Sequence, residues 1–259
     1  MNHSPTPYPE VNDLLLRLLS NAKDILRDQF VGMYLYGSLS SGDFDPVSSD
    51  IDFLFITTEA LSEETVSQLE AMHNQTWANS DKCAGKLEGA YVPQSLIRRH
   101  DPNGAECPTI NEGKFYLDRP GSDWIIQRHV VREYGVTIEG PDPKTLIDFV
   151  SPDDIRGAVR GILREWWFPM LENPAWLRDN SRGYHSYAIL TMCRVLHALE
   201  HGTIVSKPVA ARWAQVKLGG KWTDIIDLAL LARKPTPEQF DLLAPAIELV
   251  QYVRDNTAV

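Results

Sequence analysis

The first half of the chain mixes helical and strand-like hydrophobic patterns. Between residues 10 and 27 apolar residues recur every three or four positions, which is the spacing of one helix face. Short apolar runs bounded by turn residues follow, each the length of a strand. The pattern predicts helices over residues 10–27, 62–77 and 123–133, strands over residues 31–36, 51–56, 86–92, 114–117 and 136–138, a short helix or loop at 38–45, and an irregular segment at 98–113.

The pattern changes after the turn residues Gly140-Pro141-Asp142-Pro143, beyond which every predicted element is a helix. Ser151 before Pro152 marks a helix start, because serine caps free backbone N–H groups and proline suits the first helical position. Helices are predicted over residues 152–168, 183–200, 207–217, 221–233 and 237–254, the last one capped by Thr236. The predicted fold class is α/β (α+β), with a mixed sheet in a domain of residues 1–148 and an α-helical bundle in a domain of residues 149–259.

Composition narrows the possible partners. The 259 residues are 43% hydrophobic, enough to bury a core, and no apolar run approaches the roughly 20 residues of a membrane helix. The first residues lack a secretory pattern, and three cysteines (Cys83, Cys107 and Cys193) lack metal-site spacing, which favours a cytoplasmic protein. The net charge of −10 argues against nucleic acid and is compatible with a small cationic substrate. We expect a monomer or weak dimer without a membrane partner.

One local pattern points to chemistry. Gly37-Ser38 interrupts an apolar run, and Asp50-Ile51-Asp52 opens the next one. Alternate residues of a strand share a face, so Asp50 and Asp52 are predicted to lie together. Adjacent carboxylates repel each other unless a hard divalent cation joins them. The backbone N–H groups and the hydroxyl of Gly37-Ser38 suit phosphate oxygens. Together these residues predict a site for a magnesium-bound nucleotide.

Two motifs carry a family resemblance. Gly37-Ser38 followed by Ser49-Asp50-Ile51-Asp52 resembles the signature of the nucleotidyltransferase (polymerase-beta-like) superfamily. Leu190-Thr-Met-Cys-Arg194 followed by Gly202-Thr-Ile-Val-Ser-Lys207 resembles the C-terminal domain of aminoglycoside adenylyltransferases that act on streptomycin and spectinomycin. The resemblance spans about residues 30–235. It implies an N-terminal nucleotidyltransferase domain, Mg²⁺, ATP as co-substrate, and transfer of AMP to a hydroxyl of an aminoglycoside or related small molecule.

The resemblance also implies residue roles. Glu88 lies in the apolar run 87–92, where a charge is out of place, and its family counterpart is a carboxylate in the same strand context, so we predict that Glu88 is the catalytic base. It could instead be a third metal ligand or a solvated strand residue. The resulting predictions are metal binding by Asp50, Asp52 and Glu88, and nucleotide binding by Gly37, Ser38, Ser49, Arg194 and Lys207.

The acceptor pocket is predicted from aromatic and acidic residues that suit a cationic sugar. These residues are Trp176, Asp179, Tyr184, His185 and Tyr187. Tyr184 and Tyr187 stand where the streptomycin enzymes carry an acid and a histidine, so we expect streptomycin to be a poor acceptor and a spectinomycin-like or non-antibiotic acceptor to be better. Trp166 and Trp167 are predicted to pack in the core.

Other functions remain open from the sequence. One is a nucleotidyltransferase acting on a different metabolite or on a protein side chain. Another is a nucleotide-binding partner of the toxin–antitoxin type, although such proteins are usually shorter and lack a large helical domain. A third is a catalytically silent nucleotide sensor, which the intact set of Asp50, Asp52 and Glu88 disfavours.

Overall fold

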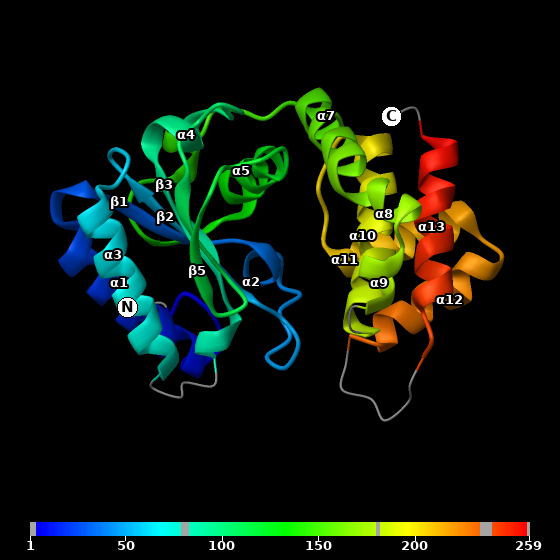
Figure 1. The fold of residues 1–259 in the computed structure, drawn as a ribbon, viewed down its shortest axis with the longest axis horizontal. Helices are drawn as coiled ribbons and strands as arrows, with labels where there is room; N and C mark the ends of the chain where they lie inside the picture. Colours follow the sequence, from blue (N-terminus) through cyan, green and yellow to red (C-terminus); the bar gives the residue numbers. More distant parts are fainter. Residues whose placement is uncertain (1–3, 79–82, 180–181, 234–239, 258–259) are drawn as a thin grey trace. The chain divides into compact units, whose positions relative to one another are not determined.

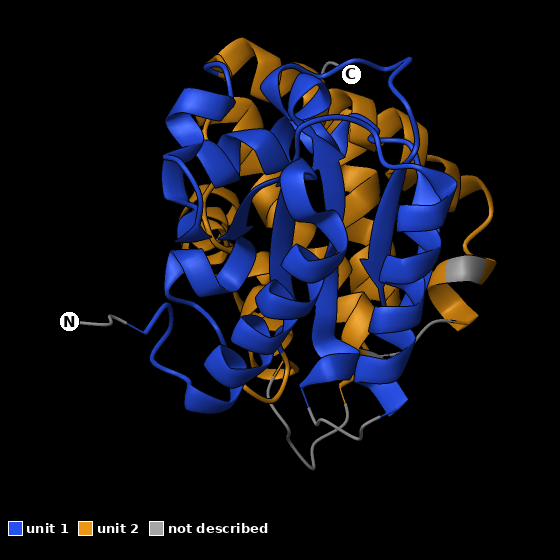
Figure 2. Ribbon diagram, turned by 90° about the vertical axis from the view of Figure 1, so that its left-hand side faces the viewer, with its two compact units in different colours: residues 1–44, 49–149 blue, residues 45–48, 150–259 orange. Residues whose placement is uncertain are grey.

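The chain divides into two compact units. The structure is a computed structural model that describes residues 4–78, 83–179, 182–233 and 240–257. Unit 1 contains residues 1–44 and 49–149, and unit 2 contains residues 45–48 and 150–259 (Figure 2). Each unit is described by itself below.

Unit 1 is built on a six-stranded mixed sheet with the strand order β5-β4-β3-β2-β1-β6. Strands β1, β2, β3 and β5 of this sheet are labelled in Figure 1. Strands β2 and β3 are parallel, and the other neighbours are antiparallel. The strands are β1 (Phe30–Leu35), β2 (Ile51–Thr57), β3 (Leu87–Pro93), β4 (Cys107–Asn111), β5 (Lys114–Asp118) and β6 (Val136–Glu139). The helices are α1 (Pro9–Leu26), α2 (Gly37–Ser41), α3 (Glu63–Ala78), α4 (Gln94–Arg98), α5 (Asp123–Tyr134) and α6 (Pro143–Leu146), with 3-10 turns at Arg27–Gln29 and Ala84–Lys86.

The sheet of unit 1 has a separate apolar core on each face. Because side chains alternate along a strand, Phe53 and Phe55 of β2 pack with α1 and α3, whereas Leu54 and Ile56 face the core that includes Val131 of α5. The even-numbered positions of β2 and β3 therefore belong to the α5 side of the sheet. Asp52 and Glu88 occupy such positions at the start of their strands.

Unit 2 is entirely helical in its described elements, and α10 is its central helix. Helix α10 packs against α7, α11, α12 and α13. The helices are α7 (Pro152–Ile162), a π-helical turn at Leu163–Trp167, α8 (Pro169–Glu172), α9 (Ala175–Asp179), α10 (Arg182–His201), α11 (Lys207–Leu218), α12 (Lys221–Leu231) and α13 (Leu243–Asn256). The predicted fold class, a mixed α/β region followed by a helical region, is confirmed. Across the described part of the chain, no helix has the length and apolar content to cross a membrane.

The predicted start of α7 is confirmed in detail. The side chain of Ser151 accepts a hydrogen bond from the backbone N–H of Asp154 at 3.1 Å, and the Asp154 carboxylate accepts one from the backbone N–H of Ser151 at 3.0 Å. Pro152 occupies the first turn. This reciprocal pair satisfies backbone donors that a helix start leaves open, which explains why the local sequence was sufficient to find it.

Two sequence-based assignments were wrong, and a third lies partly outside the described residues. Residues 98–113, predicted to be irregular, contain strand β4, which pairs with β3 and β5 on either side. Pro108 within this short run hides the strand, because proline is rare inside sheets. The helix predicted to reach residue 168 is α-helical only to Ile162 and then widens into the π-helical turn. Helix α13 begins at Leu243, and the start and cap predicted at 236–237 lie outside the described residues.

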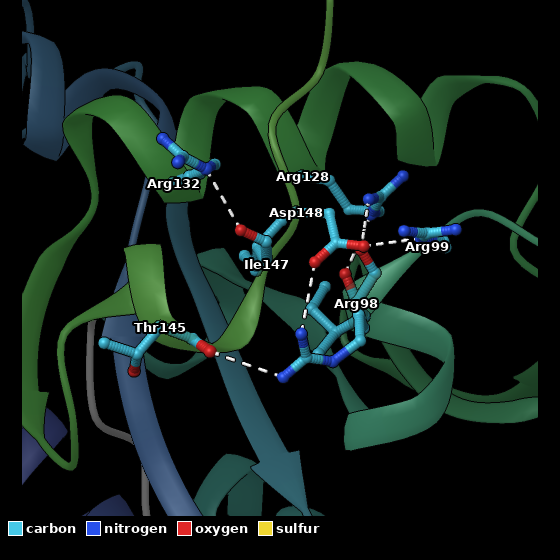
Figure 3. A network of polar contacts seen from close by, with 8 residues as sticks. Arg98, Arg99, Arg128, Arg132, Thr145, Ile147 and Asp148 are labelled. Carbon is cyan, nitrogen blue, oxygen red and sulfur yellow. Dashed lines mark hydrogen bonds and ion pairs between the residues drawn. The ribbon is translucent and has the colours of Figure 1, made fainter.

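Arginine contacts fasten the segment through which the chain leaves unit 1 (Figure 3). Arg98 and Arg99, at the end of α4, bind the two carboxylate oxygens of Asp148, with an Arg98 Nη1 to Oδ1 distance of 3.1 Å. Arg132 of α5 donates from Nε to the carbonyl of Ile147 at 3.0 Å. Because α4 and α5 both hold this segment, the exit of unit 1 is tied to the α5 side of the sheet.

Candidate functional site

Two carboxylates stand side by side on the α5 face of the sheet in unit 1. Strands β2 and β3 pair in parallel, and Asp52 is the direct register partner of Glu88. Both side chains are half-buried, while the flanking Ile51 and Leu87 are fully buried on the opposite face. Neighbouring strands lie about 4.8 Å apart, so the two carboxylates are adjacent. The pairing of β2 with β3 therefore brings Glu88 beside Asp52, as its predicted role requires.

Gly37 brings the backbone up against Asp52. Its φ angle of +62° lies in the left-handed region that favours glycine. A Cβ atom at this position would lie 1.9 Å from Oδ2 of Asp52, closer than any real contact. The backbone N–H of Tyr36 also donates to the carbonyl of Asp52 at 3.2 Å. The Gly37-Ser38 turn and the start of β2 therefore pack against each other around the Asp52 carboxylate.

Tyr36 and Asp123 adjoin the same group, and the sequence analysis did not find them. Burial raises the pKa of the Tyr36 phenol well above its usual range, and the nearby negative charges of Asp52, Glu88 and Asp123 raise it further. Tyr36 is 7% exposed and stays a proton donor. Asp123, the first residue of α5, reaches solvent, yet the protein atoms around its carboxylate raise its pKa. Tyr36 was detectable as the residue before Gly37, whereas Asp123 looked only like a helix-starting acid.

The other predicted site residues of unit 1 are the metal ligand Asp50 and the nucleotide-binding Ser49 and Ser38. Asp50 is exposed and directly precedes β2, so its sharing a strand face with Asp52 remains a prediction. Ser49 is 6% exposed, and Ser38 is half-buried in the first turn of α2. In the residues that the structure describes, no three His, Cys, Asp or Glu side chains form a group able to hold a metal ion. A metal here would rest on one or two carboxylates and take its other ligands from elsewhere.

The predicted phosphate-binding residues of unit 2 lie on α10 and α11. Arg194 is half-buried on α10, between the buried Cys193 and Val195. Lys207 is the first residue of α11, and its ammonium lies 4.6 Å from the ring centre of Tyr187. A cation over the face of an aromatic ring is attracted by the negative charge of that face. Tyr187, predicted as an acceptor residue, therefore contacts one of the predicted nucleotide residues.

Ser206 is a further polar group at the start of α11. It occupies the N-cap position, but its side chain caps no backbone N–H of the helix. Its Oγ atom is buried and has no hydrogen-bond partner within the described parts of the chain. A buried hydroxyl without a partner is costly, so a hydrogen-bond acceptor from outside the described residues would stabilise it. The signal was present in the sequence as the residue before Lys207 in the Val-Ser-Lys motif.

The other predicted acceptor residues differ in position. His185 is 6% exposed, and its Nε2 donates to the carbonyl of Leu177 at 2.8 Å, which is typical of a core histidine and does not support contact with an acceptor. Tyr184 is half-buried, and Asp179 is exposed at the end of α9. Trp176 belongs to α9, but its side chain lies outside the described residues.

The two neighbouring tryptophans have opposite environments. Trp167 is 2% exposed, which confirms the prediction of core packing, whereas Trp166 is 50% exposed, so the same prediction was wrong for it. Successive residues of an α-helix point about 100° apart, and the wider π-turn does not bring two neighbours onto one face. One of the pair therefore has to face outward.

Two family models match the chain in series. Residues 19–84 match the nucleotidyltransferase domain, and residues 145–255 match the C-terminal domain of aminoglycoside adenylyltransferases. The first match contains Gly37, Asp52 and all of α3. The second contains the described helical bundle from α7 to all but the last residue of α13, with Arg194 and Lys207.

Curated relatives match over most of their length. An aminoglycoside (3'')(9) adenylyltransferase from Klebsiella pneumoniae is 29% identical over 247 residues, 88% of each chain. One from Shigella flexneri is 28% identical over 263 residues, 95% of this chain and 94% of the relative. A spectinomycin 9-adenylyltransferase from Staphylococcus aureus is 25% identical over 227 residues, 83% of this chain and 82% of the relative.

A solved structure has the same fold. The spectinomycin adenyltransferase AAD(9) from Enterococcus, crystallised with ATP and spectinomycin, aligns with a TM-score of 0.70 at 16% identity and covers 92% of this chain and 98% of its own. Asp52 lies against Gly37 and in register with Glu88, and the two family models in series agree with the curated relatives; the chain is therefore an aminoglycoside adenylyltransferase-like nucleotidyltransferase.

Proposed function

We propose that this enzyme transfers AMP from ATP to a hydroxyl group of an aminoglycoside or a related small molecule. The observation that carries the proposal is the pairing of Asp52 with Glu88 in register on parallel strands, with the Gly37 backbone packed against the Asp52 carboxylate. Curated relatives named for aminoglycoside and spectinomycin adenylyl transfer support the acceptor class.

The carboxylate pair fits magnesium. Mg²⁺ prefers oxygen ligands and is usually held by one or two protein carboxylates together with substrate phosphates and water. The absence of a three-residue metal group in the described part of the chain is therefore compatible with a metal that arrives with ATP. Asp52 and the exposed Asp50 are the residues that would hold it, with Glu88 as an alternative third ligand. When bound, Mg²⁺ would neutralise charge on the triphosphate.

Glu88 is the proposed base. In the reaction an acceptor hydroxyl oxygen forms a bond to the α-phosphorus of ATP, the bond from that phosphorus to the bridging β-oxygen breaks, and pyrophosphate leaves. The hydroxyl proton passes to the Glu88 carboxylate, which lies half-buried beside Asp52 and reaches solvent. General-base catalysis of this kind contributes about 10²–10⁴ in rate. The buried phenol of Tyr36 remains protonated and available as a hydrogen-bond donor to this carboxylate group.

Unit 2 supplies the proposed cations. Arg194 and Lys207 would bind the triphosphate, the guanidinium in a two-pronged contact and the ammonium as a point charge. The buried Oγ of Ser206, next to Lys207 and without a partner among the described residues, would donate to a phosphate oxygen. Ser38, Ser49 and Gly37 would contact the nucleotide from unit 1.

The acceptor preference rests on α9 and α10. Asp179 and Trp176 remain proposed acceptor residues, together with Tyr184. Because tyrosines stand where the streptomycin enzymes carry an acid and a histidine, we propose that a spectinomycin-like acceptor is used in preference to streptomycin. The net charge of −10 would favour the approach of a cationic acceptor.

The test is acceptor-dependent release of pyrophosphate. Purified protein with Mg-ATP would be assayed alone, with spectinomycin, with streptomycin and with other aminoglycosides, and the acceptor would be examined by mass spectrometry for an added adenylyl group. We expect release and an adduct with spectinomycin, little with streptomycin, and loss of both in Asp52→Asn. An adduct on a different metabolite or on a protein would assign another acceptor. Folded protein that forms no adduct with any acceptor would contradict the proposal.

A further inference from the structure

Tyr187 lies in an aromatic group that continues to Lys207. Its ring centre lies 5.2 Å from that of Tyr184 and 6.1 Å from that of Trp167. The Lys207 ammonium lies over the ring of Tyr187, 4.6 Å from its centre. Trp167 is buried and Tyr187 is 40% exposed. The ring is thus supported by other rings, while part of it and the ammonium over it stay near the surface.

This arrangement limits where the Lys207 side chain can place its charge. A lysine side chain has four rotatable bonds and loses considerable conformational freedom when it is fixed in one place. When an aromatic ring already holds the ammonium, the side chain has lost part of this conformational entropy before a ligand binds. The ammonium has three N–H groups, and a contact with the ring face leaves room for a phosphate oxygen to accept from one of them.

Helix periodicity brings a second cation to the same face. Tyr187 and Arg194 are seven residues apart on α10, which is about two helical turns, so they project from the same side of the helix. By holding Lys207 over its ring, Tyr187 brings the first residue of α11 to the face of α10 that carries Arg194. Both cations therefore belong to one face of α10.

We infer that Tyr187 is a positioning residue for the triphosphate cation Lys207 and does not serve as an acceptor-binding residue. The inference rests on the proposed function, because it requires Lys207 to bind ATP. The ring of Tyr187 would then contribute to nucleotide binding by positioning the Lys207 ammonium. The acceptor would then be recognised by other residues.

The experiment is a double-mutant cycle read by calorimetric titration of the full chain with ATP in the presence of Mg²⁺. The variants are Tyr187→Leu, Tyr187→Phe, Lys207→Met and the double variant Tyr187→Leu/Lys207→Met. Loss of a partly exposed cation–ring contact corresponds to about two- to fivefold weaker binding. We expect this loss in Tyr187→Leu, rescue by Tyr187→Phe, which keeps the ring, and no loss in the double variant beyond that of Lys207→Met. The KM for ATP should rise in Tyr187→Leu, while the KM for the acceptor stays unchanged.

The matched control is Lys221→Met. Lys221 also lies over an aromatic ring in unit 2, 4.9 Å from the centre of the Trp222 ring, so its loss removes the same charge and the same type of contact, together with an exposed ion pair to Glu248. ATP affinity should not change in this control. Thermal unfolding verifies that each variant is folded, and Tyr187→Met serves if Tyr187→Leu does not fold.

Three results would overturn the inference. Unchanged or tighter ATP binding in Tyr187→Leu would show that the ring does not help Lys207 or holds it away from phosphate. An equal loss from Tyr187→Leu with and without Lys207 would show that the ring acts independently. If Lys207→Met binds ATP like wild type, Lys207 does not bind the triphosphate, and that part of the proposed function fails together with the inference. If only Tyr187→Leu binds ATP like wild type, the inference fails and the proposed role of Lys207 stands.

Discussion

Replacing Gly37 with alanine should have two separate effects: backbone strain that lowers the free energy of unfolding, and displacement of the Asp52 carboxylate that lowers turnover. At φ +62° an alanine pays about 1–2 kcal/mol for the left-handed conformation, offset by roughly 0.4–1 kcal/mol because alanine restricts the unfolded chain. The net loss in the free energy of unfolding should be about 1 kcal/mol. Gly42 is the matched control, because it has φ +77° and a Cβ there would meet nothing within 4 Å.

The two variants should differ sharply in activity. The new Cβ at position 37 would lie 1.9 Å from Oδ2 of Asp52, so the carboxylate must retreat by about 1.5 Å to reach an ordinary contact. A misplacement of this size at a reacting centre costs about 10²-fold in rate. Gly42→Ala should keep turnover near that of wild type despite a similar loss of stability.

The assay pairs urea unfolding with acceptor-dependent release of pyrophosphate for both variants. The expected pattern is similar stability in Gly37→Ala and Gly42→Ala, with turnover about 10²-fold lower only in Gly37→Ala. Equal turnover in the two variants would refute the reasoning, because it would show that the position of the Asp52 carboxylate does not matter to the chemistry. A much larger loss of stability in Gly37→Ala would show that the contact could not relax locally.

Three further predictions follow from the structure. Glu88→Gln should bind Mg-ATP nearly as wild type does and transfer about 10²–10⁴-fold more slowly, measured by calorimetry and by release of pyrophosphate; an equal loss in ATP affinity would instead make Glu88 a metal ligand. Arg194→Ala should weaken ATP binding by about ten- to a hundredfold, because charge-assisted bonds to phosphate are worth roughly 1.5–3 kcal/mol; unchanged affinity with an intact fold would exclude this contact. Burial lowers the pKa of His73 from its ordinary value of about 6.5 to about 4. The folded state therefore keeps the full stability that comes from a neutral His73 above pH 6.5. It loses up to about 3 kcal/mol of the free energy of unfolding as the pH falls towards 4. Unfolding of His73→Gln should depend less on pH over this range, and an identical pH dependence would contradict that assignment.

Local sequence determined most of the elements, because their signals lie within a few residues. The stripe of α1 and the cap of α7 depend on helical periodicity and on backbone donors that a neighbouring side chain satisfies. Strand β4 was missed because its evidence is non-local. It is a strand through its pairing with β3 and β5, and Pro108 obscures it in the sequence.

The sequence by itself also identified the residue types of the candidate site, since Gly37-Ser38 and Asp50-Ile51-Asp52 are short patterns that suggest phosphate and metal chemistry wherever they fold. Only the tertiary structure decided which groups meet. The register of β2 and β3 put Glu88 beside Asp52, and the positive φ of Gly37 put its backbone against the same carboxylate. The packing of α11 on α10 placed Lys207 over Tyr187. Each of these contacts joins residues distant in the chain, and their proximity depends on sheet register and helix packing, which no local pattern contains.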